Sequence, residues 1–282
     1  MSVDRAPAGI SVVVLSYERL EALAVLLRAL SEQQLGGLGL ELLLCNNSRA
    51  VHLAPGNGSE VGDLLAALPD AKVFNSNHNW LCRVRYSLAT LARYETVCFI
   101  DDDLAPADAH VLRDLYDALG GLRPVDIVSA WTALWTAWDD AALTKVRMGF
   151  TRPAPTQLTE CDYVGPGLCM FDRRILFAPG LLDLPPEALR SDSSWFPWVT
   201  SMTLGTRKYY VPSYGRWRRH AQHTHAALMD GAGFRTELYS AYKQAWKRGY
   251  QPVLSRLGDD PRVDASPERW AARHLTAETD RW

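Results

Sequence analysis

Short apolar runs that alternate with helical patterns are the feature that most limits the folds open to this chain of 282 residues. Residues 10–15 read ISVVVL, a β-branched run typical of a strand buried on both faces. Residues 20–30 repeat their apolar side chains at helical spacing, and residues 40–45 and 96–100 form further apolar runs. This alternation predicts a doubly wound α/β fold built on parallel strands, and the length allows a large core.

Polar residues directly follow each predicted strand. SYER follows residues 10–15, NNS follows 40–45, NSNHN follows a short strand at 71–74, and DDD follows 96–100. Because ligands of such sheets bind beyond the carboxyl ends of the strands, we expect these four segments to meet at one site. Helices are predicted at 81–94 and after Ala107, strands at 126–130, 163–171 and 208–211, and a surface loop at 52–62.

Three consecutive carboxylates, Asp101, Asp102 and Asp103, form the densest acidic cluster of this series. Because side chains alternate along a strand, Asp101 and Asp103 are expected on one side and Asp102 on the other. Two carboxylates on one side suit Mg²⁺ or Mn²⁺, which would offset the charge that builds on a departing diphosphate. The alternative is a helix N-cap formed by Asp103 or Asp108.

Sequences that bind phosphate through backbone loops are missing from the chain. It has no Walker A sequence, GGLG precedes a strand instead of following one, and neither HExxH nor GxSxG occurs. A nucleotide would therefore be held by side chains and a metal. The side chains placed for this are Arg19, Asn46, Asn79, Arg83 and Arg85, each of which also suits an ordinary turn or surface.

Asp192, in the segment RSDSSWFPWVT, has two interpretations. It caps a helix, or it is a single acid at a reaction centre that acts as nucleophile, base or acceptor holder. Spacing alone does not choose between them.

Three other segments remain open as well. The glycines of VGPGLCMF permit close approach of a ligand or of another backbone. Tryptophans 131, 135 and 138 follow helical spacing, as a core stripe or as a sugar platform. A basic cluster is formed by Arg216, Arg218 and Arg219, and three histidines follow it: His220, His223 and His225. The cluster is interpreted as solvated surface or as a phosphate contact.

Charge and cysteine usage limit the partners and the compartment. A formal net charge of −2 does not favour nucleic acid or an anionic membrane. Five cysteines without CxxC spacing indicate a reducing compartment. With no signal-peptide pattern and no apolar stretch long enough to span a bilayer, a cytoplasmic protein is expected.

Taken in order, these motifs resemble the GT-A class of nucleotide-sugar glycosyltransferases, and within it most closely the exostosin-like family. The resemblance extends over about residues 10–214. It rests on the order of VVVLSYER, LLLCNNS, NSNHNWLCRVR, VCFIDDD, DIVSAW, VGPGLCMF and SDSSW before YYVP. It implies an α/β, Rossmann-like mixed sheet flanked by helices in residues 1–215, and a helical extension or lid over residues 216–282.

The resemblance implies a metal-dependent hexosyl- or N-acetylhexosaminyltransferase. A UDP-sugar would be the donor, Mn²⁺ or Mg²⁺ the cofactor, and a hydroxyl of a small molecule or glycan the acceptor. Asp192 would be the second acid of the family's acidic pair beside the reacting carbon. The implied donor contacts are Arg19, Asn46, Asn79, Arg83 (or Arg85 in its place), Asp101, Asp102 and His223 or His225, with Asp103 and Asp101 at the metal.

Two departures keep the chemistry open. Ser191 stands where the family has the first acid of the pair, and the membrane anchor of the animal members is absent. The resemblance implies retention of configuration, whereas the wider class allows inversion with Asp192 as general base. The donor, the acceptor and a second copy of the chain are the partners considered, without nucleic acid. The rival functions are a sugar-1-phosphate nucleotidyltransferase and a non-catalytic carbohydrate-binding protein.

Overall fold

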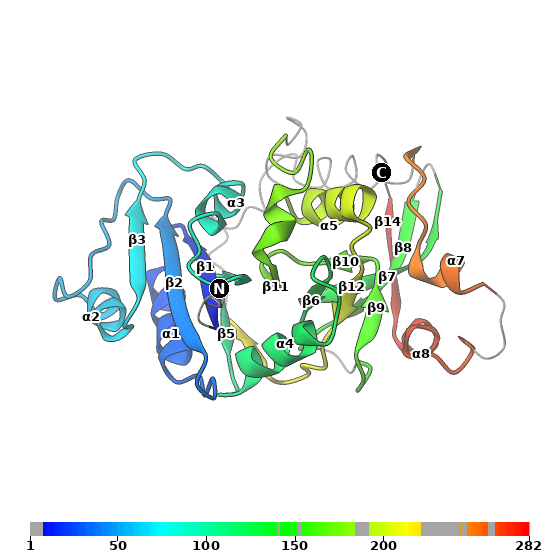
Figure 1. The fold of residues 1–282 in the computed structure, drawn as a ribbon, viewed down its shortest axis with the longest axis horizontal. Helices are drawn as coiled ribbons and strands as arrows, with labels where there is room; N and C mark the ends of the chain where they lie inside the picture. The colour runs from blue at the N-terminus through cyan, green and yellow to red at the C-terminus, as the bar shows by residue number, and fades with distance from the viewer. Residues whose placement is uncertain are drawn as a thin grey trace, which may run out of the picture.

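The computed structural model describes residues 8–139, 142–151, 154–183, 192–220, 243, 247–258 and 263–281. An eight-stranded mixed sheet forms its centre (Figure 1). In spatial order its strands are β3 (Ala71–Asn75), β2 (Gly39–Asn46), β1 (Gly9–Ser16), β4 (Thr96–Asp101), β11 (Leu168–Asp172), β6 (Ile127–Ser129), β12 (Lys208–Tyr210) and β9 (Thr159–Cys161). The α/β mixed sheet expected from the resemblance is confirmed.

The strands of this sheet do not all run in one direction. β3, β2, β1 and β4 pair in parallel, whereas β11 is antiparallel to both of its neighbours, β4 and β6. β12 is parallel to β6 and antiparallel to β9. The wholly parallel sheet suggested by the alternating pattern is therefore wrong beyond β4, because an apolar run such as LCMF does not encode strand direction.

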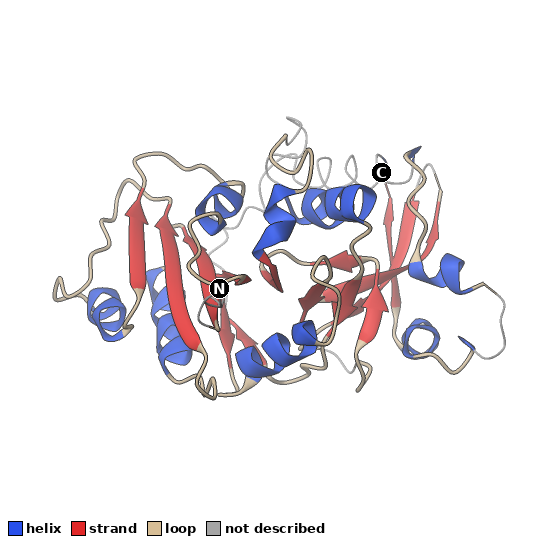
Figure 2. Ribbon diagram, viewed as in Figure 1, coloured by secondary structure: helices blue, strands red, loops and turns tan. Residues whose placement is uncertain are grey.

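Helices cover both faces of the sheet (Figures 1 and 2). Alternate residues of β1 enter two separate cores: Val12 packs with α1 (Leu20–Ser31) and α4 (Val111–Gly120), and Val13 packs with α3 (Val84–Ala89) and α5 (Asp192–Leu204). Burial on both faces explains why β1 lacks the polar alternation of a half-exposed strand. Another helix, α2 (Glu60–Ala67), is capped by Ser59 and begins inside the segment predicted as a loop.

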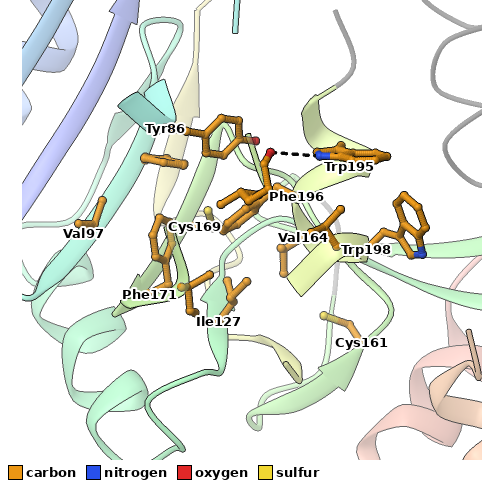
Figure 3. Packing of buried hydrophobic residues seen from close by; sticks show 14 of the residues in the cluster. Tyr86, Val97, Ile127, Cys161, Val164, Cys169, Phe171, Trp195, Phe196 and Trp198 are labelled. Carbon is orange, nitrogen blue, oxygen red and sulfur yellow. Dashed lines mark hydrogen bonds between the residues drawn. The ribbon is translucent and has the colours of Figure 1, made fainter. Parts of the chain in front are cut away.

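Aromatic side chains fill the core between β4, β11 and α5. Phe171 of β11 lies 5.2 Å from the ring of Phe196 on α5, and Phe99 of β4 lies 4.9 Å from Phe171. Figure 3 shows this packing, with Tyr86 of α3 on the same side and Trp195 donating a hydrogen bond to the Leu181 carbonyl at 3.1 Å. This core fixes α5 against the central strands.

A second sheet has the order β10 (Tyr163–Val164), β7 (Thr132–Trp138), β8 (Ala142–Met148) and β14 (Ala277–Arg281). The helical spacing of the tryptophans wrongly indicates a helix, because Trp135 and Trp138 lie on the strand β7. A bulge between Trp135 and Ala137 adds one residue, which returns Trp138 to the face of Trp135, and their rings meet at 5.4 Å. Trp135 is buried, so it serves the core and is not a sugar platform.

The described residues after position 215 include both helices and strands. α7 (Val253–Leu257) and α8 (Pro267–His274) agree with the expected helical extension. β14 joins the second sheet beside β8, and β13 (Trp217–Arg219) pairs with β5 (Leu104–Pro106) directly after the acidic triplet. The division at residue 215 stays a prediction. No helix among the described residues is both long enough and apolar enough to cross a bilayer.

A buried polar network connects α5 to the segment before α7. The Lys208 ammonium donates to Ser201 Oγ at 2.6 Å and to the Pro197 carbonyl at 3.3 Å, and it lies 3.3 Å from the Tyr250 hydroxyl. That hydroxyl donates to Asp162 at 3.1 Å. Burial raises the pKa of Asp162 to about 6 and lowers the pKa of Lys208 to about 8. Burying the Lys208 and Asp162 charges therefore costs free energy, which their hydrogen-bond partners and their mutual attraction offset.

We expect Lys208→Met to lower the free energy of unfolding by about 3 kcal/mol at about pH 7, because the Asp162 carboxylate is then buried without its cation. Since the folded-state pKa of Asp162 is raised, its ionised form costs stability as the pH rises through about 6. The loss in the variant should therefore shrink at about pH 5, where Asp162 is protonated. Denaturant unfolding at both pH values measures this, with Lys247→Met, at an exposed lysine, as the control. An equal loss at both pH values would contradict the charge as the cause.

Candidate functional site

The four polar segments meet at the carboxyl edge of the parallel strands, as expected from the sequence. Leu15 of β1 is in register with Asp101 of β4, and Ser16 with Asn46 of β2. The Tyr17 amide donates to Asp102 at 3.3 Å, which joins SYER to DDD. This edge therefore gathers carboxylates, amides and guanidinium groups from segments that are far apart in the sequence.

Arg19 holds two carboxylates of the triplet. One of its terminal nitrogens, Nη2, binds Asp102 Oδ1, and the other, Nη1, lies 3.2 Å from Asp103 Oδ2. Asp102 is 0% exposed and Asp103 is 3% exposed. Burial raises the pKa of Asp102 to about 7, against the opposing effect of Arg19. The two acids thus share one cation.

Asp101 pairs with a different arginine, Arg85. Arg85 Nη2 donates to Asp101 Oδ1 at 3.0 Å, and its Nη1 donates to the Pro166 carbonyl at 2.6 Å. That Asp101 and Asp103 share a side stays a prediction, although its basis in strand alternation does not hold. β4 ends at Asp101, so the alternation of a strand does not extend through Asp103.

Gly167 is required by the position of Asp101. The Asp101 amide donates to the Gly167 carbonyl at 2.7 Å, and a Cβ at Gly167 would lie 1.9 Å from Asp101 Oδ2. The close approach predicted for the glycines of VGPG is confirmed here, and the approaching group is a carboxylate of the protein itself.

Arg219 completes the set of cations around the triplet. The pairing of β13 with β5 places Arg219 Nε 3.6 Å from Asp103 Oδ2, and the His220 amide donates to the Asp103 carbonyl at 2.9 Å. Three guanidinium groups therefore face three carboxylates among the described residues. Sequence reasoning noticed the basic cluster but missed this contact, since a pairing of two three-residue strands leaves no periodic pattern.

The asparagines predicted as nucleotide contacts order the loops of this edge. Asn46 donates to the Val51 carbonyl at 2.6 Å and to Asn75 Oδ1 at 2.9 Å, and it is buried. Asn79 accepts from the Leu81 amide at 2.9 Å. A direct contact of either asparagine with a nucleotide stays a prediction.

Two residues of the edge loops adopt a left-handed backbone, which costs about 1–2 kcal/mol for a residue other than glycine. They are Glu18, with φ 61°, and Leu81, with φ 58°. Glu18 accepts from Ser48 Oγ at 3.3 Å, and the Leu81 carbonyl accepts from Asn47 at 3.2 Å. Strain that neighbouring loops hold in place is common at functional sites.

Arg83 is exposed beside this strained loop. Its guanidinium lies 5.8 Å from the ring of Trp80, which is itself largely exposed. The side chain that meets the triplet is Arg85, which the sequence placed among the candidate donors and which the resemblance implied as the substitute for Arg83. Arg83 thus stays available at the surface of the edge for a ligand.

Several predicted residues lie partly or wholly outside the description. His223, His225 and Ser191 are outside the described residues. Helix α5 begins at Asp192, whose side chain lies outside the description. The roles given to these residues stay predictions.

The carboxylates fit a cation that arrives with ligands of its own. Among the described residues, no group of three or more His, Cys, Asp or Glu is arranged to hold a metal. Mn²⁺ and Mg²⁺, however, take hard carboxylate oxygens and complete their shells with water and phosphate oxygens. Asp101, with a side chain that is 35% exposed, is open to such an ion, whereas Asp103 is 3% exposed and has Arg19 and Arg219 beside it.

Comparisons with known proteins place the fold. No family model matches the chain, and no curated protein matches it in sequence. The structure is similar to the crystal structure of S. aureus TarS 1–349 in complex with UDP-GlcNAc, with a TM-score of 0.54 and 13% identity over 84% of this chain and 65% of that chain. A second structure of TarS 1–349 gives a TM-score of 0.49 and 15% identity over 72% and 60%. The chain spans less than two thirds of these chains.

The likeness shows that this chain shares its fold with TarS. The likeness supports that fold without singling out the exostosin-like family.

We expect Gly167→Ala to lower the free energy of unfolding by about 1–3 kcal/mol, because the new methyl group displaces the Asp101 carboxylate from Arg85. In an Asp101→Ala background the same substitution should cost clearly less, since the clashing atoms are gone. Gly120→Ala is the control, as a Cβ there meets no atom within 4 Å. A double-mutant cycle by denaturant unfolding measures the coupling, and equal losses in both backgrounds would contradict it.

Proposed function

We propose that this protein is a glycosyltransferase that moves a hexosyl or N-acetylhexosaminyl group from a nucleoside diphosphate sugar, a UDP-sugar, to a hydroxyl of a small molecule or glycan. The observation that carries the proposal is the acidic triplet, surrounded by Arg19, Arg85 and Arg219, at the carboxyl edge of the parallel strands. TarS, whose fold is similar, is known in complex with UDP-GlcNAc. The proposal extends the sugar donor from that neighbour to this chain.

The side chains of the site divide into those that would touch the donor and those that hold them. Asp101 and Arg83 are exposed enough to meet a nucleotide sugar. Asp102 is fully buried against Arg19, so its contribution to the donor would pass through that arginine. Asn46 and Asn79 would act in the same indirect way, by fixing the loops.

Asp103 and Asp101 would hold Mn²⁺ or Mg²⁺, in line with the resemblance to the exostosin-like family. When bound, the cation would neutralise negative charge on the departing diphosphate. Arg19 would position Asp103, because it contacts that carboxylate and is itself anchored on Asp102, and Arg85 would position Asp101. His223 or His225 would contact the diphosphate.

Asp192 would be the catalytic acid at the first residue of α5. It would take the proton of the acceptor hydroxyl in an inverting reaction, or stabilise the cationic sugar in a retaining one. The core around Phe196 holds this helix against β11, which would fix the position of the acid. A cytoplasmic site of action is part of the proposal and is supported by the free state of all five cysteines.

Donor binding is tested by thermal unfolding with UDP, GDP and CMP, each with and without Mn²⁺. We expect UDP with Mn²⁺ to raise the unfolding temperature, because a ligand that binds only the folded state stabilises it. Asp103→Asn should remove this metal-dependent gain. Asp117→Asn, an exposed carboxylate paired with Arg113, is the matched control and should keep it. The absence of any metal-dependent stabilisation by a nucleoside diphosphate would contradict the proposal.

The catalytic role is tested with Asp192→Asn, since asparagine caps a helix as well as aspartate does. We expect the variant to bind UDP with Mn²⁺ normally and to lose about 100-fold or more of sugar transfer from a UDP-sugar. Product formation with a panel of hydroxyl acceptors, followed by mass spectrometry, measures the transfer. Full transfer by the variant would show that Asp192 serves only as a cap.

A further inference from the structure

Arg219 stands where a cation bound to Asp103 would lie. Its Nε is 3.6 Å from Asp103 Oδ2, on the oxygen that Arg19 approaches at 3.2 Å. Asp103 is 3% exposed, and of the two arginines at this oxygen Arg219, at 35% exposure, is the more open to solvent. Arg219 and an incoming cation therefore compete for the same carboxylate.

The two arginines at Asp103 are held very differently. Arg19 is anchored by its bond to the fully buried Asp102, and its side chain is 15% exposed. Arg219 is 35% exposed, and its distance to Asp103 exceeds that of a normal hydrogen bond. Arg19 is thus a fixed part of the site, whereas the Arg219 side chain is free to exchange partners.

The second contact of Arg219 gives its side chain a place close to the site. The guanidinium lies 5.4 Å from the centre of the Trp131 ring. That ring is fixed between two glycines: a Cβ would come within 3.4 Å of it at Gly149 and within 3.3 Å at Gly165. A cation over an aromatic face is attracted by the ring, so Arg219 keeps a favourable contact when it leaves Asp103.

The backbone of this segment remains in place during such an exchange. β13 pairs with β5 along Trp217–Arg219, and the His220 amide donates to the Asp103 carbonyl. Arg216 adds ion pairs to Asp108 at 3.0 Å and to Asp114 at 2.7 Å. Exchange therefore needs only a rotation of the Arg219 side chain.

We propose that Arg219 is an exchangeable counter-charge, which neutralises Asp103 when no cation is bound and yields it to a divalent cation that enters with the nucleoside diphosphate. Its guanidinium, held over Trp131, is then available to the diphosphate. The inference rests on the proposed function and adds a regulation of the same site. Because a cation on its own must displace Arg219 without any gain from the diphosphate, the exchange couples the binding of the two ligands.

The coupling predicts opposite effects of one substitution on two ligands. In Arg219→Gln, Asp103 keeps only Arg19 of the two arginines, so Mn²⁺ alone should bind about tenfold more tightly than it binds the unchanged protein. UDP without metal should bind about tenfold more weakly, because a cation that faces the diphosphate is lost. A general loss of folding would weaken both ligands and so cannot imitate this pattern.

Isothermal titration with Mn²⁺ alone and with UDP alone makes the measurement. Arg219→Lys keeps the positive charge and should therefore bind Mn²⁺ as weakly as the unchanged protein does. Arg218→Gln, at the exposed neighbour on β13, is the matched control and should leave both affinities unchanged. If the unchanged protein and Arg219→Gln both bind UDP with Mn²⁺ but have equal affinities for Mn²⁺ alone, this inference is overturned and the proposed function is not. Failure of the unchanged protein to bind UDP under any condition overturns the proposed function as well.

Discussion

The ion pair between Arg19 and Asp102 is the interaction on which the site depends. Asp102 is removed from solvent completely, and a buried carboxylate is tolerable only with a cation and hydrogen bonds at hand. Arg19 supplies the cation from the loop after β1, and the Tyr17 amide supplies a hydrogen bond from the same loop. The two strand ends are thereby joined, and the positions of Asp103 and of α1, which begins directly after Arg19, follow from that junction.

Around this junction the charges are arranged in order of accessibility. Arg85 is 7% exposed and held by the Pro166 carbonyl, Arg19 is 15% exposed and held by Asp102, and Arg219 is outermost at 35%. A ligand with phosphate groups thus meets guanidinium groups that differ in how firmly they are held. Such an order lets an anionic ligand rearrange the outer contacts while the inner pairs maintain the geometry of the edge.

The sequence predicted the parts of the fold that are governed by burial. The runs at residues 10–15, 40–45 and 96–100 match β1, β2 and β4 because a strand buried on both faces needs an unbroken apolar run. The meeting of the polar ends followed from the same reasoning. Strand direction, the bulge in β7 and the pairing of β13 with β5 could not be predicted, since each depends on which distant segments pack together. For that reason the sequence left Arg219 open as solvated surface or as a phosphate contact.

β14 has a consequence for the order in which the chain folds. It covers the edge of β8, but residues 277–281 are synthesised long after residues 142–148. During synthesis the second sheet therefore exposes the backbone groups of β8 to other chains, and exposed strand edges promote association. The lysine and arginine of the β8 sequence ALTKVRM place charges in this strand, a common protection against edge-to-edge pairing while the partner strand has yet to emerge.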